Sequence, residues 1–302
     1  VPQMVFGELL TGDNYDDSED RVVGGRNGYG AKLANVFSTQ FVVETLDTKS
    51  GKKYHQTWRN NMGTVSPPKI TAAGRRKDFT RVTFCPDFAR FGLTGLDDDM
   101  YALLCRRVVD LAGTTPADVR VYLNGTRLDI RDFKAYCKLY VPEIQHIRLN
   151  PRWEICIALA PDQQAQQVSF VNSICTTKGG EHVKCVADDV SRGIVELAAR
   201  QFKDLDVRAS TVRHSMFVFV NALITNPSFD SQTKELLTTR AAKFGPAQFK
   251  PRAPEKFLKS VIKHSGIVDE VLHFARAKSK RNMERKMGNR KKNKLTGVPK
   301  LA

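Results

Sequence analysis

The 302-residue sequence contains no run of the roughly 18 or more consecutive apolar residues that a membrane-spanning helix requires. Its first residues, VPQMVFGELLTGDNYDD, lack the charged start and the long apolar run of a secretory signal. Six cysteines are spread along the chain without a CxxC pair, which favours reduced, buried thiols over a disulfide framework. These absences argue against a membrane protein and against a small secreted domain held by disulfides.

The chain has enough apolar residues for two domains of ordinary size. Hydrophobic residues make up 41% of the sequence, which is sufficient for two separate cores in a chain of this length. The sequence begins with Val1 rather than methionine, and its last residues, TGVPKLA, carry no terminus-like feature. We therefore expect an internal piece of a longer, intracellular protein.

Positive charge is the strongest compositional signal. The formal net charge is +16, and residues 276–294 contribute +9 of it through ten lysines and arginines against one glutamate. Such a surface attracts polyanions, with an affinity that falls as salt rises. Charge alone leaves two interpretations open, a nucleic-acid-binding surface or a solvated helical face followed by a linker.

The first half of the chain has the pattern of an antiparallel sheet with helices on one face. Strands are predicted over 41–47, 54–60 and 81–88, and the pair Asn124-Gly125 predicts a hairpin turn. Residues 97–113 predict an amphipathic helix, with acidic residues at its start and Gly113 at its end. We expect its inner face to be formed by Met100, Leu103, Leu104, Val108 and Leu111.

The second half alternates strands and helices. Strong alternation over 152–159 predicts a strand, and residues 166–174 are expected to form a neighbouring strand. The nearly all-apolar segment 215–224 predicts a central strand buried on both faces. A long helix is expected over 181–202, with a second helical stretch over 254–278 that breaks at Gly266. The inner face of the first of these helices is predicted to contain His182, Val183, Val186, Val190, Ile194 and Leu197.

The segment GGRNGYGAK, residues 24–32, has the composition of a phosphate-binding loop. A Walker A loop would need GxxxxGK followed by serine or threonine, and the dinucleotide and kinase loops would need GxGxxG; neither pattern fits. What remains is GxxGxG followed by a helix expected near Ala31. Glycines allow successive amides to converge on an anion, and a helix N-terminus adds partial positive charge.

Lys32 adds a full positive charge at that same helix end, where a cation is ordinarily unfavourable. The arrangement becomes favourable if an anion lies between the lysine and the helix. The alternative is a flexible glycine turn without a ligand, and the accompanying Arg26, Asn27 and Lys32 weigh against it.

Taken together, these motifs resemble eukaryotic DNA topoisomerase II, a member of the GHKL ATPase superfamily. GGRNGYGAKLANVFST resembles the family's ATP lid, and VPQMVFGELLTGDNYDD the segment before it. SFVNSICTTKGGEHV resembles the transducer strand and turn shared with bacterial gyrase, and NPSFDSQTKELLT contains the family's QTK loop. LTGVPKL resembles the approach to the metal-binding TOPRIM domain. The motifs occur in family order over essentially the whole chain.

The resemblance implies an α+β fold, in which the C-terminal part of a GHKL (Bergerat-type) ATPase sandwich precedes an α/β transducer. On this basis we expect the ATPase part with its lid over residues 1–130 and the transducer over 131–275. A basic linker towards the TOPRIM domain is expected over 276–302.

The resemblance also implies which residues contact ATP. Lys234 is expected to contact the γ-phosphate, whose loss on hydrolysis would free two domains to move. From the residues alone, the competing interpretation is an ordinary turn in which Ser231 or Thr233 caps a helix over KELLTT. The full set of implied nucleotide contacts is Gly25, Arg26, Asn27, Gly28, Tyr29, Gly30, Ala31, Lys32, Gln232, Thr233 and Lys234.

Double-stranded DNA is the implied macromolecular partner, contacted through phosphates and therefore without sequence preference. A homodimer is expected for the full-length protein, in the nucleus or in an organelle that holds DNA. The expected DNA-contacting residues are Lys278, Lys280, Arg281, Arg285, Lys286, Arg290, Lys291 and Lys292, with Arg200 and Lys203 as weaker candidates.

Several parts of the family's machinery are expected to lie outside this chain. These are the general-base glutamate, the asparagine that binds Mg²⁺, the adenine-reading aspartate of a DxGxG motif and the DNA-cleaving tyrosine. The chain alone is therefore expected to have negligible ATPase activity, since it supplies charge but no base. Two alternatives remain open: a non-hydrolysing nucleic-acid-binding module that retains the fold, and another GHKL ATPase such as a mismatch-repair protein or a chaperone.

Two further sets of residues are interpreted without a ligand. His182 and Cys185 have HxxC spacing on a predicted helix, but no second pair lies nearby, so a metal site is not expected. Trp58 and Trp153 are predicted to be core residues.

Overall fold

A computed structural model describes residues 1–290, except residues 13, 15–17, 26, 75–76, 163 and 202–206. The side chains of residues 201, 278–279 and 286–290 are likewise not described. The chain divides into two compact units, Val1–Arg106 and Arg107–Ala302.

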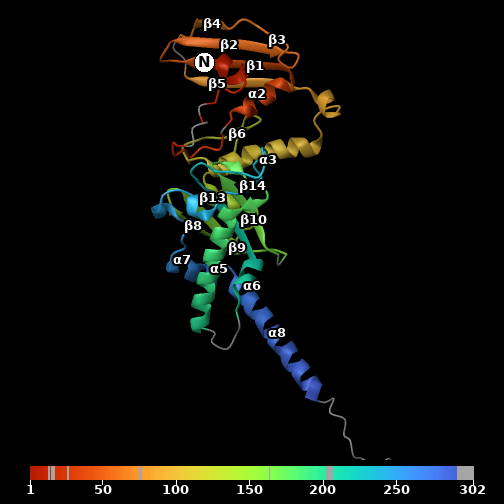
Figure 1. The fold of residues 1–302 in the computed structure, drawn as a ribbon, viewed down its shortest axis with the longest axis vertical. Coiled ribbons are helices and arrows are strands. Elements are labelled where there is room, and N and C mark those ends of the chain that lie inside the picture. Colours follow the sequence, from red (N-terminus) through yellow and green to blue (C-terminus); the bar gives the residue numbers. More distant parts are fainter. Residues whose placement is uncertain are drawn as a thin grey trace, which may run out of the picture. The chain divides into compact units, whose positions relative to one another are not determined.

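The first unit is built on one antiparallel sheet (Figure 1). The order is β3-β2-β1-β5, and β4 also pairs with β2, so the predicted antiparallel pattern is confirmed. The strands are β1 (Ser38–Asp47), β2 (Lys52–Arg59), β3 (Thr64–Val65), β4 (Lys69–Ala72) and β5 (Phe79–Pro86).

One face of this sheet carries the core of the first unit. Phe41, Val43 and Trp58 are fully buried there, which confirms the assignment of Trp58 to the core. Phe6 of helix α1 (Pro2–Gly7) and Ala34 of α2 (Tyr29–Val36) pack against them. The glycine-rich segment therefore leads into a helix that is anchored on this sheet.

The inner face predicted for the helix over 97–113 is wrong. Helix α3 (Asp98–Thr114) does form, but Leu103, Leu104 and Leu111 are each about half exposed. Its buried residues are Asp110, Ala112 and Gly113. A Cβ on Gly113 would lie 2.4 Å from Cγ of Tyr136, so the helix packs through its smallest side chains, which apolar periodicity does not register.

A five-stranded mixed sheet forms the centre of the second unit (Figure 1). The order is β11-β10-β13-β9-β8, with β10 and β13 parallel and the other neighbours antiparallel. The predicted central strand is confirmed as β13. The strands are β8 (Gln145–Asn150), β9 (Trp153–Leu159), β10 (Gln166–Val171), β11 (Ile174–Cys175) and β13 (Met216–Ala222).

Successive strand side chains point to opposite faces of this sheet, and each face is buried because other elements pack on it. Ile155 and Val220 belong to a core cluster with the long helix α5 (Glu181–Gln201), whereas Phe219 and Cys156 belong to a second cluster with α4 (Phe133–Cys137). The connection from β10 through α5 to β13 is the crossover that a parallel pair requires.

The remaining elements lie outside these two five-stranded sheets. The break predicted at Gly266 is confirmed, since α7 ends at His264, α8 begins at Ile267 and Gly266 has φ of +74°. Figure 1 shows α8 continuing well past the sheet of its own unit. The elements are the hairpin β6 (Tyr122–Leu123) and β7 (Thr126–Arg127), β12 (Gly179–Gly180), α6 (Ala209–His214), β14 (Leu236–Leu237), α7 (Glu255–His264), α8 (Ile267–Arg290) and the 3-10 turns Phe88–Phe91, Ala241–Lys243 and Ala247–Phe249.

We expect Phe219→Ala to lower the free energy of unfolding by about 3–5 kcal/mol, because it leaves a cavity beneath the centre of the sheet. Phe274→Ala is the matched control, since Phe274 is 44% exposed and its loss should cost less than about 1 kcal/mol. Chemical denaturation of both variants provides the measurement. Equal losses would contradict the assignment of Phe219 to the core.

Candidate functional site

The glycine-rich segment forms an open turn at the start of α2. Gly28 caps the helix with φ of +65°, in the left-handed region that favours glycine, and no side chain caps this end among the described residues. The helix begins at Tyr29, two residues before the predicted Ala31, so Gly30 lies in its first turn. A Cβ on Gly25 or Gly30 would have nothing within 4 Å. The first amides of α2 are therefore approachable by an anion.

Lys32 folds back towards the helix start. Its side chain is buried, and its Nζ lies 3.2 Å from the position that a Cβ on Gly28 would take. A lysine here adds its charge to the partial positive charge of the helix N-terminus, which is unfavourable without an anion. This geometry fits a phosphate group. Arg26 lies outside the described residues.

The QTK sequence lies at the tip of a short hairpin in the second unit. Phe229 pairs antiparallel with Leu237, and Thr238 N donates to Ser228 O at 2.9 Å. The turn closes through Lys234 N, which donates to Ser231 O at 3.1 Å. Lys234 itself has φ of +59°. The alternative of a capped helix over KELLTT is wrong, because Leu236 and Leu237 form strand β14.

The three side chains at the hairpin tip differ in exposure. Those of Gln232 and Thr233 are exposed, whereas Lys234 is half-buried. Burial lowers the pKa of the Lys234 ammonium, because desolvation disfavours its charged form. A partly desolvated cation interacts more strongly with a phosphate than one in bulk water.

The hairpin is seated against the start of α5. Gly179 and Gly180, which form β12, pair in parallel with Leu236 and Leu237. Lys178 extends the contact, since its amide donates to Glu235 O at 3.0 Å and its Nζ lies 2.6 Å from Glu235 Oε2. The long helix therefore begins directly after residues 178–180, which we call the seat of the hairpin.

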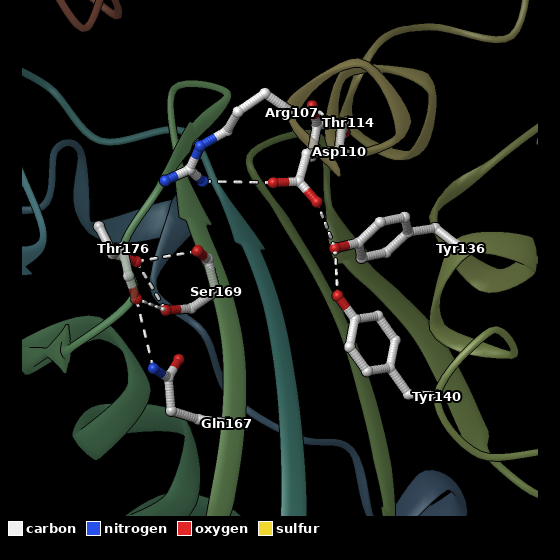
Figure 2. Close-up of polar contacts among 8 residues, drawn as sticks. All are labelled: Arg107, Asp110, Thr114, Tyr136, Tyr140, Gln167, Ser169 and Thr176. Carbon is white, nitrogen blue, oxygen red and sulfur yellow. Dashed lines mark hydrogen bonds and ion pairs between the residues drawn. The ribbon is translucent and has the colours of Figure 1, made fainter. Parts of the chain in front are cut away.

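A buried polar cluster lies beside residues 178–180, and no local sequence pattern indicates it. The Ser169 and Thr176 hydroxyls are 2.6 Å apart, and Thr176 Oγ1 lies 3.1 Å from His182 Nε2. Gln167 Nε2 donates to Thr177 O at 2.8 Å. Figure 2 shows Gln167 and Ser169 of β10 beside Thr176. His182, in the first turn of α5, is fully buried as predicted.

Burial lowers the pKa of His182 to about 3, since desolvation penalises the charged imidazolium. Its Nδ1 has no hydrogen-bond partner among the described residues. The imidazole is therefore neutral at physiological pH and acts as a structural group.

A second buried polar network joins α3 to α4 (Figure 2). Tyr136 donates its hydroxyl hydrogen to Asp110 Oδ1 at 2.7 Å, and the Tyr140 hydroxyl lies 2.8 Å from that of Tyr136. Arg107 lies 3.3 Å from Asp110 Oδ2. Burial raises the pKa of Tyr136, so the phenol stays protonated as a donor. A buried aspartate on a helix gives no periodic signal, so this network is not predictable from apolar spacing.

A groove of about 770 Å³ runs between α6 and α8. Phe274 and Val271 contribute apolar surface to it, and no acidic residue is found among the described residues that line it. The basic and imidazole side chains that line it are Arg208, His214, His273, Arg281 and Arg285.

Of the other predicted DNA-contacting residues, those whose side chains are described do not line this groove. Lys280 is exposed on α8. Arg200 is exposed in the last turn of α5. The pKa of Glu255 in α7 is lowered mainly by Lys259 and to a smaller extent by Arg200. For Lys278, Lys286 and Arg290 only the helical backbone is described. Lys203, Lys291 and Lys292 lie outside the described residues.

The described residues include no group of three or more His, Cys, Asp or Glu side chains that could hold a metal ion. No helix in the described part of the chain is both long and apolar enough to cross a membrane.

Comparison with known proteins gives consistent matches. The family model described as DNA gyrase B matches residues 123–291. The chain is similar to probable DNA topoisomerase 2 of Dictyostelium discoideum, at 44% identity over 100% of this chain and 20% of that protein. It is also similar to DNA topoisomerase 2 of Pisum sativum, at 46% identity over 96% of this chain and 20% of that protein. The chain thus spans about a fifth of the length of these relatives.

Two solved structures resemble the chain along most of its length. The ATPase region of Saccharomyces cerevisiae topoisomerase II matches with a TM-score of 0.82 and 44% identity, over 91% of this chain and 71% of that one. The ATPase and transducer domains of DNA topoisomerase II from Balamuthia mandrillaris match with a TM-score of 0.85 and 42% identity, over 93% and 72%. These matches confirm the α+β fold class and the family resemblance.

Acidification should destabilise the protein through His182. Because its pKa is lowered in the folded state, its contribution is complete above pH 6.5 and is lost as pH falls towards about 3. The loss amounts to about 1.4 kcal/mol per pH unit in that window. We expect His182→Gln to lose less stability than wild type between about pH 6.5 and 4.5, with exposed His264→Gln as the control. Parallel stability curves for wild type and His182→Gln in chemical denaturation would contradict this account.

Proposed function

The chain belongs to the DNA gyrase B family, together with the eukaryotic type II topoisomerases, and on that premise we propose that it is the ATP-binding and transducer region of such an enzyme. The full-length protein would pass one DNA duplex through a transient break in another, driven by ATP. Two separate observations support the proposal: an open, cationic start of α2 in the first unit, and a lysine-tipped hairpin in the second.

The first half of the proposed nucleotide site is the lid at residues 25–32. The unfavourable concentration of positive charge around Lys32 and the start of α2 becomes favourable when a triphosphate binds. Open space around Gly25 and Gly30 allows the phosphate oxygens to approach backbone amides. The lid therefore contributes charge stabilisation, without a group that could remove a proton from water.

The second half is Lys234 at the hairpin tip. We propose that its ammonium contacts the γ-phosphate, with Gln232 and Thr233 beside it. A half-buried cation strengthens that contact, and hydrolysis would remove the terminal phosphate and with it the attraction. Because the hairpin is paired to the start of α5, loss of the contact would be transmitted to the second unit as a whole.

Mg²⁺ is expected with the triphosphate, but we assign none of the described residues to it, since they contain no suitable cluster. We further propose that the domain boundaries follow the family, with the lid-bearing part over 1–130, the transducer over 131–275 and the basic linker over 276–302. A homodimer in the nucleus, or in a DNA-containing organelle, is the expected setting. The relatives and neighbours carry topoisomerase names, which does not favour a mismatch-repair ATPase, a chaperone or a non-hydrolysing module.

Double-stranded DNA is the proposed partner of the α6–α8 groove. Arg281 and Arg285 are four residues apart on α8 and therefore share one face of the helix. A DNA backbone presents phosphates that suit these guanidinium groups and apolar deoxyribose surfaces that suit Phe274. Such contacts carry no sequence preference.

We expect Lys234→Ala in the intact protein to lower ATP turnover by roughly ten- to a hundredfold, because a charge-assisted hydrogen bond contributes about 1.5–3 kcal/mol. Lys243→Ala, which removes an exposed lysine of the same unit, is the control and should leave turnover unchanged. Steady-state ATP hydrolysis provides the measurement. Equal rates for Lys234→Ala and wild type would show that Lys234 does not contact the reacting phosphate.

For the groove, we expect the double change Arg281→Gln and Arg285→Gln to weaken binding of a random-sequence duplex. The slope of log affinity against log salt should become shallower by about 1.8, since each lost phosphate contact accounts for about 0.9. Arg120→Gln with Arg127→Gln removes two exposed arginines near the β6–β7 hairpin and should leave the slope unchanged. Fluorescence anisotropy at several salt concentrations measures both. An unchanged slope for the groove variant would exclude DNA from this surface.

A further inference from the structure

We propose that Gly180 is a positioning residue for the nucleotide response, because its lack of a side chain seats the QTK hairpin against the start of α5. The inference rests on the proposed contact between Lys234 and the γ-phosphate. It concerns a residue that touches no nucleotide itself and acts through the backbone pairing of β12 with β14.

The seat is formed by unusually close backbone approach. A Cβ on Gly180 would lie 2.4 Å from the carbonyl oxygen and 2.7 Å from the amide nitrogen of Leu237. These are backbone atoms, so rotation of a side chain cannot relieve the contact. The φ of Gly180 is +137°, a conformation that residues with side chains rarely adopt. Any other residue at position 180 would push the two segments apart.

The two segments that meet at Gly180 are each held in place by packing in the core. On one side, Glu181 begins the 21-residue helix α5, whose inner face is buried in the core. On the other side, Leu237 is itself 1% exposed and belongs to the same core cluster. Its strand also pairs with Phe229 on its opposite edge. The return strand of the hairpin is therefore held between two neighbours, and Gly180 sets the spacing to one of them.

The seat determines where Lys234 lies relative to α5. Only Glu235 separates Lys234 from β14, and the amide of Lys178 donates to Glu235 O at 3.0 Å. The turn at 231–234 is closed by its own hydrogen bond, so the tip follows the strand that carries it. A shift of β14 away from Gly180 would therefore displace the Lys234 ammonium, and an ion contact that depends on burial would weaken steeply with distance.

The proposed test measures discrimination between nucleotides in the intact protein. The readout is the ratio of the dissociation constant for ADP to that for a non-hydrolysable ATP analogue. Lys234→Ala should lower this ratio by about tenfold or more, because it removes one charge-assisted contact to the terminal phosphate. Gly180→Ala should lower it by a similar factor, with the affinity for ADP unchanged.

Gly193→Ala is the matched control. It lies within α5, about 20 Å along the helix from Gly180 at a rise of about 1.5 Å per residue, and its added Cβ would meet Leu258 Cδ1 of α7 at 2.4 Å. We expect a lower melting temperature for this variant and a nucleotide ratio within about twofold of wild type, since a merely structural clash does not act on Lys234.

The results for the two variants distinguish the proposed nucleotide contact of Lys234 from the proposed positioning role of Gly180. If Lys234→Ala lowers the ratio and Gly180→Ala lowers only the melting temperature, the role of Gly180 is overturned and the proposed role of Lys234 stands. If Lys234→Ala leaves the ratio unchanged, the proposed nucleotide contact fails and the positioning role fails with it.

Hydrogen exchange on the wild-type protein gives a test that does not depend on a variant folding. The amides of residues 178–181 and 235–238 should open together, and the ATP analogue should slow their exchange while ADP should not. Fast, independent exchange of 235–238 with protected 178–181 would contradict the proposal.

Discussion

The burial of one face of α5 against the five-stranded sheet is the interaction on which the second unit depends. Val186, Val190 and Ile194 pack with residues of β9 and β13. All of them belong to the largest of the three core clusters among the described residues. The same helix anchors its neighbours, because Asp188 pairs with Arg213 of α6 and Asp189 accepts from the amide of Ala253 before α7. At its start it carries the seat for the hairpin. One rigid helix of about 30 Å thus joins the proposed nucleotide contact to the helices beside the basic groove.

Local sequence patterns predicted several parts of the fold. The central strand β13 follows from a nearly all-apolar segment, the inner face of α5 from the spacing of its apolar residues, and the break at Gly266 from a single glycine. The inner face of α3 could not be found in this way, because Ala112, Gly113 and Asp110 are buried while its leucines are exposed. Steric fit against Tyr136 and satisfaction of a buried carboxylate outweigh apolar periodicity there.

The candidate site shows a similar division. The motif GGRNGYGAK indicated a helix start with an anion-binding character, and the structure adds that Lys32 is buried and folded back towards Gly28. The sequence KELLTT has good helix formers, yet Leu236 and Leu237 form a strand because Gly179 and Gly180 offer them backbone partners some 60 residues away in sequence. Long-range pairing of this kind has no local signal. The same reason hid the polar cluster of Ser169, Thr176 and His182.

We propose that the lid and the QTK hairpin contact the same triphosphate. This proposal is tested most directly by affinity labelling of the intact protein with an ATP analogue that carries an amine-reactive group on its γ-phosphate, followed by mass spectrometry. The account predicts modification of Lys234 and Lys32, blocked by excess ATP, and no modification of Lys234 by an ADP analogue with the reactive group on its β-phosphate. Labelling confined to the lysines of α8, or the same labelling of Lys234 by both analogues, would contradict it.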